Sequence, residues 1–226
     1  MGLSPNTSLM QGLVIENIQE LLSDWKENAS FMSIYIVTQE LLYIFFGDHE
    51  LCTEFAEKYG LYHSKHQPAA PGIFPEAFYQ GFSLYVCAQR SGRKRKHKKM
   101  AIYRHKLLKT WARKGNPNVI HLDLFLDAER AVLERKVEVA LKKYREAVVI
   151  AVRGGFIHHA ALFHERLGDY EWNELRDAKE AAYHYQESIK LFDEWGATRK
   201  VQLVLEKTKC ISDVDVAVLQ SKSRRS

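Results

Sequence analysis

Proline, glycine and cysteine are scarce in this chain. Its 226 residues contain five prolines, twelve glycines and three cysteines. So few turn-forming residues disfavour a fold made of many short strands. Cys52, Cys87 and Cys210 have no metal-binding spacing, and we interpret them as buried thiols of a protein in a reducing compartment. Hydrophobic residues make up 46% of the chain, which is enough for a substantial core.

Long apolar runs are also missing. The most apolar stretch, residues 31–46, contains Gln39 and Glu40, and we interpret it as too short and too polar to span a bilayer. Residues 1–6 carry no positive charge, and the apolar residues that follow are interrupted by polar ones, so the pattern of a signal peptide is not seen. We therefore expect a cytoplasmic protein without a membrane span.

Signatures of catalysis are not found either. The chain has no GxSxG, no phosphate-binding GxxxxGK[ST] and no HExxH motif, and the "RGGF" of residues 153–156 is interpreted as a turn. His159 and His164 are five residues apart, a step that turns the two imidazoles away from one helix face, and His158 precedes them. Glu165 and Asp169 are interpreted as a solvated helix face. We expect no enzymatic activity, no metal and no cofactor.

Three glycines recur at a regular interval. Gly115, Gly155 and Gly196 each close an amphipathic stretch, and they stand 40 and 41 residues apart. Glycine ends helices readily because it adopts a left-handed conformation without a Cβ clash. A period of about 40 residues is typical of paired-helix repeats, in which a chain builds a surface more readily than a catalytic pocket.

Two copies of this repeat share a buried-face pattern. Small, aromatic and small residues follow one another at steps of four and three, which place all three on one helix face. The positions are Ala140, Tyr144 and Ala147 before Gly155, and Ala181, Tyr185 and Ser188, with Trp195, before Gly196. The same offset before Gly115 gives Met100, Arg104 and Leu107, so we regard that copy as incomplete.

Helical periodicity and turn signals extend over most of the chain, and they predict an all-α fold of about ten helices. The expected organisation is an amino-terminal helical lobe (1–60), a linker loop (61–74), a repeat region (75–209) and a disordered tail (210–226). The predicted helices are 7–28, 31–46, 50–59, 75–89, a helix that ends at 114, 120–134, 135–153, 156–167, 176–195 and 197–209. His63 and His66 fall in the linker loop and are expected to be solvated.

The repeat region resembles a known family. The segments that carry the resemblance are "GNPN" followed by His121, "GGFIHHAAL" with Glu165 further on, and "LFDEWGATRKV". They look like the tetratricopeptide-like carboxy-terminal helical region of large signalling ATPases. Those proteins join a STAND-type or AAA-type nucleotide-binding module to protein-kinase, histidine-kinase or cyclase modules. The resemblance implies an α-solenoid of stacked antiparallel helical hairpins, and the ATPase activity is not carried over because its motifs are missing here.

One basic cluster accounts for the net charge. It comprises Arg93, Lys94, Arg95, Lys96, Lys98 and Lys99, and without these six the chain has 27 basic against 28 acidic side chains. The cluster could be a nuclear-localisation signal or a patch for an anionic partner, or simply the solvated start of a helix. We favour the helix start. Nucleic acid is disfavoured because the nearest aromatic residues, Tyr103 and Trp111, are better explained as core residues.

The function that these observations favour is a non-catalytic protein-interaction scaffold, with a protein or peptide partner held in a concave helical groove. One alternative is a regulatory or sensor fragment of a multidomain signalling ATPase, for which an upstream ATPase module would be the partner. A second alternative is a nucleic-acid adaptor that uses the basic cluster of residues 93–99.

Overall fold

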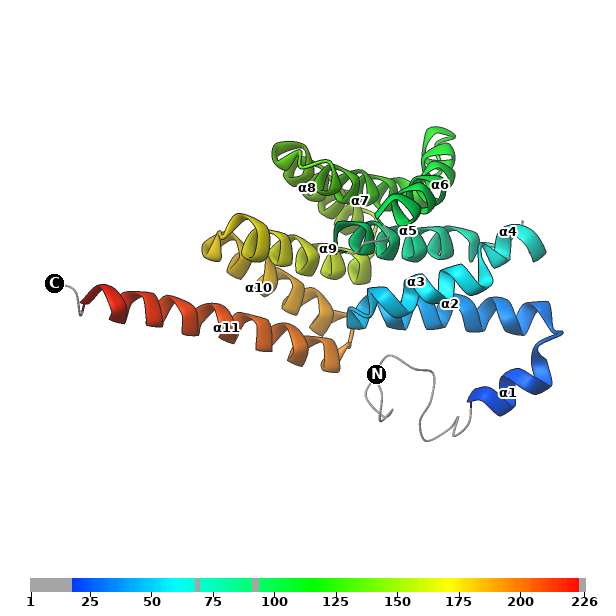
Figure 1. Cartoon of the computed structure of the whole chain (residues 1–226), viewed down its shortest axis with the longest axis horizontal. Helices are drawn as coiled ribbons and strands as arrows, with labels where there is room; N and C mark the ends of the chain where they lie inside the picture. Colours follow the sequence, from blue (N-terminus) through cyan, green and yellow to red (C-terminus); the bar gives the residue numbers. More distant parts are fainter. Residues whose placement is uncertain (1–17, 68–69, 91–93, 224–226) are drawn as a thin grey trace. The chain divides into compact units, whose positions relative to one another are not determined.

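The computed structural model describes residues 18–67, 70–90 and 94–223, without side-chain detail at Lys94, Cys210 and 212–223. Throughout these ranges the chain is helical and contains no strand, which confirms the predicted all-α class. The elements, shown in Figure 1, are α1 (Ile18–Trp25), α2 (Ala29–Phe46), α3 (His49–Tyr59), α4 (Tyr62–His66), α5 (Ile73–Arg90), α6 (Lys94–Arg113), α7 (Pro117–Leu133), α8 (Val137–Arg153), α9 (Ile157–Tyr170), the π-helix η1 (Glu171–Leu175), α10 (Ala178–Glu194) and α11 (Thr198–Ser223). The predicted helix 7–28 begins outside the described residues.

The chain divides into two compact units, residues 1–147 and 148–226, with the boundary inside α8. The expected linker, residues 61–74, lies within the first unit and contains α4. Glu76 of α5 fixes α4 in place, because its carboxylate accepts hydrogen bonds from the backbone N–H groups of Tyr62 (2.6 Å) and His63 (3.1 Å). His63 is consequently buried, and our expectation of a solvated side chain is wrong there.

The core of the first unit is built around α5. From Glu76 to Ala88 every residue of this helix is buried, as expected of a helix that is surrounded on all sides. It packs against α2 and α3 and against α6 and α7. Phe78 and Phe82 meet the ring of Phe125 of α7 edge-on, with ring centroids 5.7 and 4.8 Å apart.

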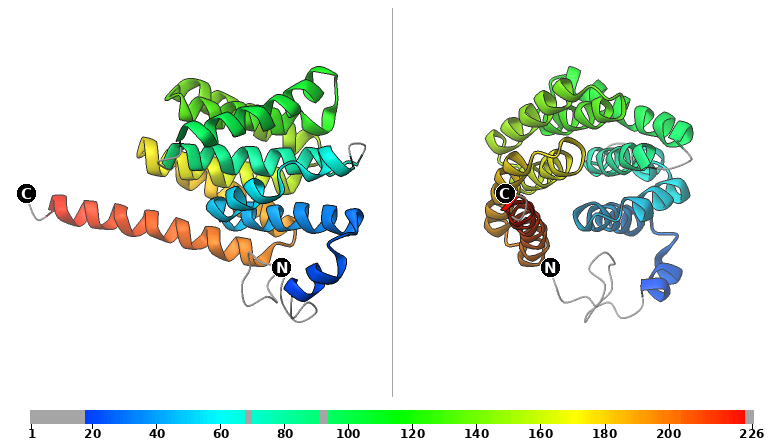
Figure 2. Two further views of the ribbon diagram at one scale, coloured as in Figure 1. Left: turned by 45° about the vertical axis from the view of Figure 1, so that its right-hand side comes forward. Right: turned by 60° about the vertical axis from the view of Figure 1, so that its left-hand side comes forward.

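In the second unit, α10 packs along α9 and α11, as the views in Figure 2 show. Gly168 of α9 allows the close approach, because a Cβ atom there would lie 2.8 Å from Cε1 of Tyr185 and 3.2 Å from the carbonyl oxygen of Ala181. The Ser188 hydroxyl donates a 2.9 Å hydrogen bond to the carbonyl oxygen of Ala161. The small and aromatic residues of this copy therefore form a helix contact.

Left-handed residues close the helices. Gly115, Gly155 and Gly196 have φ of +81°, +74° and +77°, as the repeat predicted. In each turn the glycine N–H and the next N–H bond back to carbonyl groups of the last helical turn, so the closure involves only backbone groups. Arg135 and Arg176 take the same conformation, with φ of 58° and 59°. The left-handed conformation of these two residues was not predicted, because a search for glycine does not find it.

The copy before Gly115 is more regular than we expected. In α6 the buried line consists of Ala101, His105 and Leu108, at the predicted steps of four and three. It lies one residue later than the Met100, Arg104 and Leu107 that we aligned by counting back from the glycine. The small-first pattern is therefore present, with an imidazole in place of the phenol ring.

A repeated hydrogen bond relates α7 and α8 to α9 and α10. The Tyr144 hydroxyl donates to the Glu129 carboxylate (2.6 Å), and the Tyr185 hydroxyl donates to the Asp169 carboxylate (2.8 Å). Glu129 and Asp169 are 40 residues apart, whereas Tyr144 and Tyr185 are 41 residues apart. The segment from Asp169 to Tyr185 is therefore one residue longer than the segment from Glu129 to Tyr144. The π-helix η1 lies in that interval, and a π-turn is the usual way for a helix to take up one extra residue.

One further expectation differs from the structure. By length and composition, α2 is long and apolar enough to cross a membrane, whereas we interpreted residues 31–46 as too short and too polar. Half of α2 is buried in the first unit, including Gln39 and Glu40. The helix α11 extends to Ser223, into the expected tail of residues 210–226, where no side-chain detail is described after Ile211.

Candidate functional site

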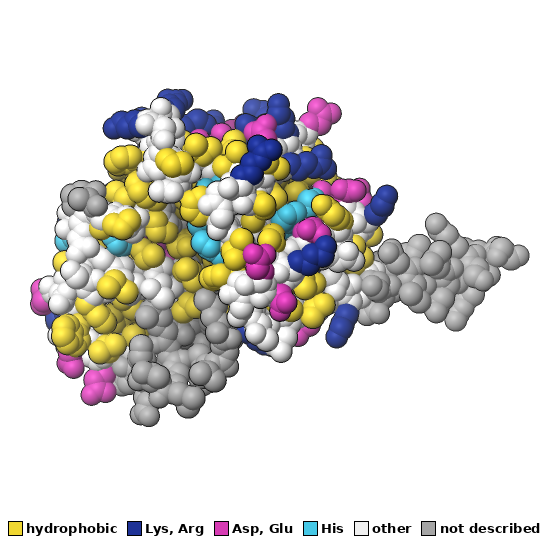
Figure 3. Space-filling model, turned by 180° about the vertical axis from the view of Figure 1, so that it is seen from behind, with side chains coloured by type: hydrophobic (Ala, Val, Ile, Leu, Met, Phe, Trp, Pro, Cys, Tyr) yellow, Lys and Arg dark blue, Asp and Glu magenta, His cyan; other side chains and the backbone are white. Residues whose placement is uncertain are grey.

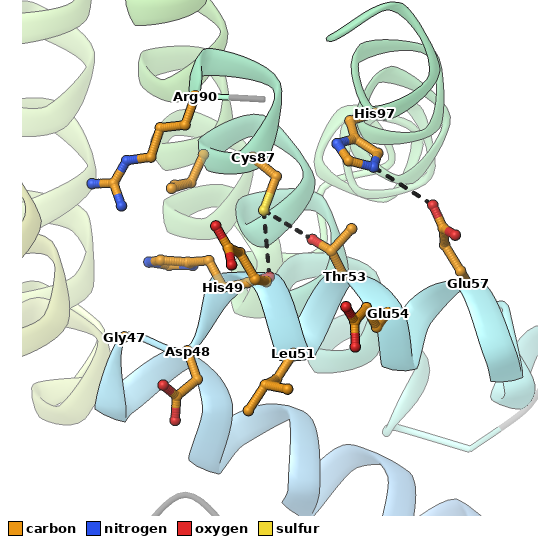
Figure 4. A pocket seen from close by; sticks show the side chains of 12 residues that line it. Gly47, Asp48, His49, Leu51, Thr53, Glu54, Glu57, Cys87, Arg90 and His97 are labelled. Carbon is orange, nitrogen blue, oxygen red and sulfur yellow. Dashed lines mark hydrogen bonds and ion pairs between the residues drawn. The ribbon is translucent and has the colours of Figure 1, made fainter. Parts of the chain in front are cut away.

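A pocket of about 470 Å³ opens on α3 in the first unit (Figure 4). The α2–α3 turn and α3 supply one wall, and the carboxy-terminal end of α5 and the start of α6 supply the other. Its lining includes Thr53, Cys87, Arg90, His97 and four carboxylates, which are Asp48, Glu50, Glu54 and Glu57.

The thiol of Cys87 faces this pocket, but its surroundings do not activate it. Burial raises the pKa of the Cys87 thiol, which favours the protonated form. The hydroxyl of Thr53 lies 3.3 Å from Sγ, and Sγ lies 3.5 Å from the backbone carbonyl oxygen of His49. The guanidinium of Arg90, the nearest cation in this view, is turned away from the thiol (Figure 4). Cys87 thus belongs to the packing of α5 on α3, and Cys52 is buried beside it.

Negative charge predominates in the pocket. Glu57 pairs with Lys96 (2.7 Å) and lies 3.5 Å from Nε2 of His97. Among the lining residues that the structure describes, three further carboxylates remain beside one guanidinium, that of Arg90. A cavity with this balance of charge attracts cationic groups.

The basic cluster lies at the start of α6. Lys94 begins the helix, Arg95 and Lys99 are exposed, Lys98 is partly exposed, and Lys96 pairs with Glu57. Arg93 lies outside the described residues. The expected start of a helix is confirmed, and the pairing of Lys96 removes one charge from any anionic-partner patch. On the molecular face seen in Figure 3, lysine and arginine side chains are spread among acidic and hydrophobic ones.

A buried polar network crosses the first unit. Gln80 of α5 donates to the Glu40 carboxylate (2.7 Å) and to the carbonyl oxygen of Gly60 (2.6 Å), and accepts from Nε of Arg104 (2.9 Å). Burial and the nearby Glu76 carboxylate raise the pKa of Glu40 well above its ordinary value. The raised pKa favours the protonated form of Glu40, and the network is a structural element of the core.

In the second unit Glu165 and Asp169 are ion-paired, whereas we expected a solvated face. Lys200 of α11 lies 2.6 Å from the Glu165 carboxylate, and Lys207 bridges Glu165 (2.9 Å) and Asp169 (2.8 Å). Burial alone would raise the pKa of Glu165, but the two ammonium groups outweigh it and lower the pKa to about 2. These contacts hold α11 to α9.

A pair of buried imidazoles lies at the contact between α9 and α10. Nδ1 of His164 is 2.8 Å from Nδ1 of His184. Burial lowers the pKa of His164 to about 4, so this ring is neutral near pH 7. On its other side, Nε2 of His184 lies 3.7 Å from the Glu171 carboxylate. His158 and His159, which we considered together with His164, instead lie in the first turn of α9, where the His158 ring packs beside Trp195 at 5.4 Å.

The predicted repeat positions lie in the core and in the turns between helices. The side chains of the small and aromatic positions are buried: Ala140, Tyr144, Ala147, Ala181, Tyr185 and Ser188. Trp195 follows the last residue of α10, and the three glycines form the turns. None of these residues lines the pocket on α3. The pocket and the imidazole pair were not found from sequence because their members come from segments that no motif links.

Comparison with protein-family models, curated proteins and solved structures gives no match. The resemblance to the helical region of signalling ATPases therefore stays a prediction from the residues quoted above.

Proposed function

We propose that this protein is a non-catalytic, tetratricopeptide-like interaction module that holds a cationic segment of a partner protein. The observation that carries the proposal is the acidic pocket on α3. Its volume of about 470 Å³ accommodates a long side chain of the partner together with neighbouring atoms. In the proposed arrangement, paired helices serve as the rigid support and the pocket serves as the point of recognition.

Charge selects the occupant. Asp48, Glu50 and Glu54 carry carboxylates that the pairing of Glu57 with Lys96 leaves available to a partner. A guanidinium or ammonium group that enters between them gains charge-assisted hydrogen bonds, and an arginine has the geometry to make two at once. We therefore expect an arginine-bearing or lysine-bearing peptide.

The chemistry of the pocket supports binding over catalysis. A nucleophile needs a depressed pKa or an adjacent base, and the Cys87 thiol has a raised pKa with a hydroxyl and a carbonyl group beside it. The histidine at the rim, His97, lies near Glu57. The pocket therefore offers polar contacts and shape to a ligand.

The proposal is tested with displayed random peptides selected on the full chain, followed by fluorescence anisotropy of the enriched peptides. We expect enrichment of basic residues and an affinity that falls with salt. The double variant Glu50→Gln/Glu54→Gln should weaken binding at least tenfold. The matched control, Glu138→Gln/Glu194→Gln, changes two exposed carboxylates of α8 and α10 outside the pocket and should bind as the wild type does.

Two results would overturn the proposal. One is the absence of any enriched basic peptide in a selection on folded protein. The other is equal loss of affinity in the pocket variant and in Glu138→Gln/Glu194→Gln, because binding would then depend on total charge and not on the pocket.

A further inference from the structure

Three side chains with metal-ligating atoms converge in the second unit. Glu171 begins the π-helix η1, and Glu180 and His184 lie on α10. One ligating atom from each residue lies within 4.8 Å of the other two. Glu171 and His184 are buried, with 2% and 4% of their surfaces exposed, and Glu180 is partly exposed. We propose that these three residues bind a single divalent transition-metal ion of the Zn²⁺ class.

The spacing of the ligands suits such an ion. Glu180 and His184 are four residues apart on one helix and therefore share a face. Bonds of 2.0–2.2 Å in a tetrahedral site place neighbouring ligand atoms about 3.3–3.6 Å apart. The 3.7 Å between Nε2 of His184 and the Glu171 carboxylate is close to that value. Glu180, the most accessible of the three, closes the remaining distance by a change of rotamer.

The types of donor select the class of ion. One imidazole with two carboxylates suits Zn²⁺ and its first-row neighbours, whereas Ca²⁺ and Mg²⁺ prefer oxygen ligands alone. Three protein ligands also leave a fourth position for water, as in many zinc sites.

His164 serves as a positioning residue for His184. The two Nδ1 atoms are 2.8 Å apart, so one ring donates its N–H and the other accepts. When His184 donates from Nδ1, its Nε2 carries a lone pair directed toward the side on which Glu171 lies. Metal-binding histidines are usually held by such a second hydrogen bond, which fixes both tautomer and ring orientation.

The preceding helix pair provides an internal comparison. Subtracting 40 from the number of Glu171 gives Ala131, the matching residue of α7. Subtracting 41 from the numbers of the two α10 ligands gives the matching residues of α8: Val139 for Glu180 and Lys143 for His184. The pair α7 and α8 forms the same tyrosine–carboxylate hydrogen bond as α9 and α10, although it has no Glu, Glu and His at the three positions of the cluster. The packing of a helix pair thus does not require the cluster. The pair α9 and α10 is one residue longer than α7 and α8, and this extra residue lies in η1. Glu171 is the first residue of η1.

A second group, His105, Asp123 and Asp127, has the same types of donor but is a weaker candidate. The ammonium group of Lys109 lies 2.9 Å from Asp127. Asp123 lies 2.9 Å from Nε2 of His105, and the hydroxyl of Tyr85 contacts Nδ1 of the same ring at 3.1 Å. A lysine therefore already supplies the positive charge in that group.

The test is titration of the metal-free full chain with Zn²⁺, followed by calorimetry, and with Co²⁺, followed by visible absorption. We expect one ion per chain and the absorption of a tetrahedral Co²⁺ site. Glu180→Gln should raise the dissociation constant at least tenfold. This variant keeps the fold, because Asp177 caps α10 by accepting from the N–H of residue 180 and a glutamine satisfies a capping box as well as a glutamate.

Glu194→Gln is the matched control, since it makes the same change at an exposed residue of the same helix, outside the cluster, and should bind Zn²⁺ as the wild type does. Glu171→Gln is the second variant and should also lose affinity. The proposal is overturned if the folded wild type binds no ion at micromolar Zn²⁺. It is equally overturned if Glu180→Gln and Glu194→Gln, both folded by circular dichroism, bind alike, because the ion would then be held by residues other than the cluster.

Discussion

The two units of the molecule each bury a glutamate, and they do so in opposite ways. Glu40 in the first unit is fully buried beside an amide, and its pKa is raised because burial and the charge of Glu76 outweigh the attraction of Arg104. Glu165 in the second unit contacts two lysines, and its pKa is lowered to about 2. The surroundings of the same residue type therefore favour the protonated form in one core and the ionised form in the other.

This difference shows what each unit depends on. The first unit is held by aromatic packing around α5, and the partner of Glu40 in its polar network is the amide of Gln80. The second unit attaches α11 through charges, because Lys200 and Lys207 both reach α9. Removing one member of a buried ion pair leaves an uncompensated charge, whereas removing a neutral acid does not.

The largest effect is expected from Glu165→Gln. Lys200, which is 3% exposed, would keep its position but lose its counter-ion, and we expect a loss of about 3–5 kcal/mol in the free energy of unfolding at pH 7. Urea unfolding followed by circular dichroism measures it. The folded-state pKa of Glu165 is depressed, so its contribution is present above pH ~4.3 and is lost as the pH falls toward 2. A variant that is equally destabilised at pH 7 and at pH 2.5 would contradict this account.

Gly168→Ala should reverse the usual effect of an alanine in a helix. At an open helical position this change stabilises by about 1 kcal/mol. Here the new Cβ atom would lie 2.8 Å from the ring of Tyr185, and we expect a loss of about 1–3 kcal/mol in the free energy of unfolding. Thermal unfolding checks the sign. An unchanged or higher melting temperature would show that α9 and α10 separate at no cost.

Glu40→Gln should change the pH dependence of the first unit. A raised folded-state pKa contributes stability that is present below pH ~4.3 and is lost as the pH rises through the folded-state value. The wild type should therefore lose up to about 1.4 kcal/mol per pH unit from this group, and the variant should not. Urea unfolding between pH 5 and pH 9 measures the difference, which should grow with pH. A constant difference would mean that Glu40 is ionised in the folded state.

The smallest effect is expected from Arg135→Gly. Arg135 has φ of 58°, a conformation that costs about 1 kcal/mol for a residue with a Cβ atom and nothing for glycine. We expect a gain of about 0.5–1 kcal/mol in the free energy of unfolding. Lys142→Gly, in the middle of α8, is the control and should lose about 1 kcal/mol. A loss in both variants would show that Arg135 makes a contact through its side chain.

The sequence predicted what depends on local pattern. Helical class, the glycine turns and the buried faces at Tyr144 and Tyr185 all follow from spacing along a single helix. It did not predict that Glu165 meets Lys200, because these residues are 35 positions apart and each looks like part of a solvated face. The pocket on α3 escaped detection for the same reason, since its lining joins residues 47–57 to residues 86–97.

The left-handed residues at 115, 135, 155, 176 and 196 have a consequence for how this chain tolerates change in length. Each helix from α6 to α10 ends at one of them, and backbone hydrogen bonds close the end. An inserted or deleted residue then changes only the helix in which it occurs, because the turn that follows sets the position of the next helix and of its buried face. The extra residue at η1 illustrates this containment: α10 presents Ala181, Tyr185 and Ser188 in the same phase as the matching residues of α8. Insertions and deletions should therefore accumulate before these turns, because there they leave the buried faces of the other helices unchanged.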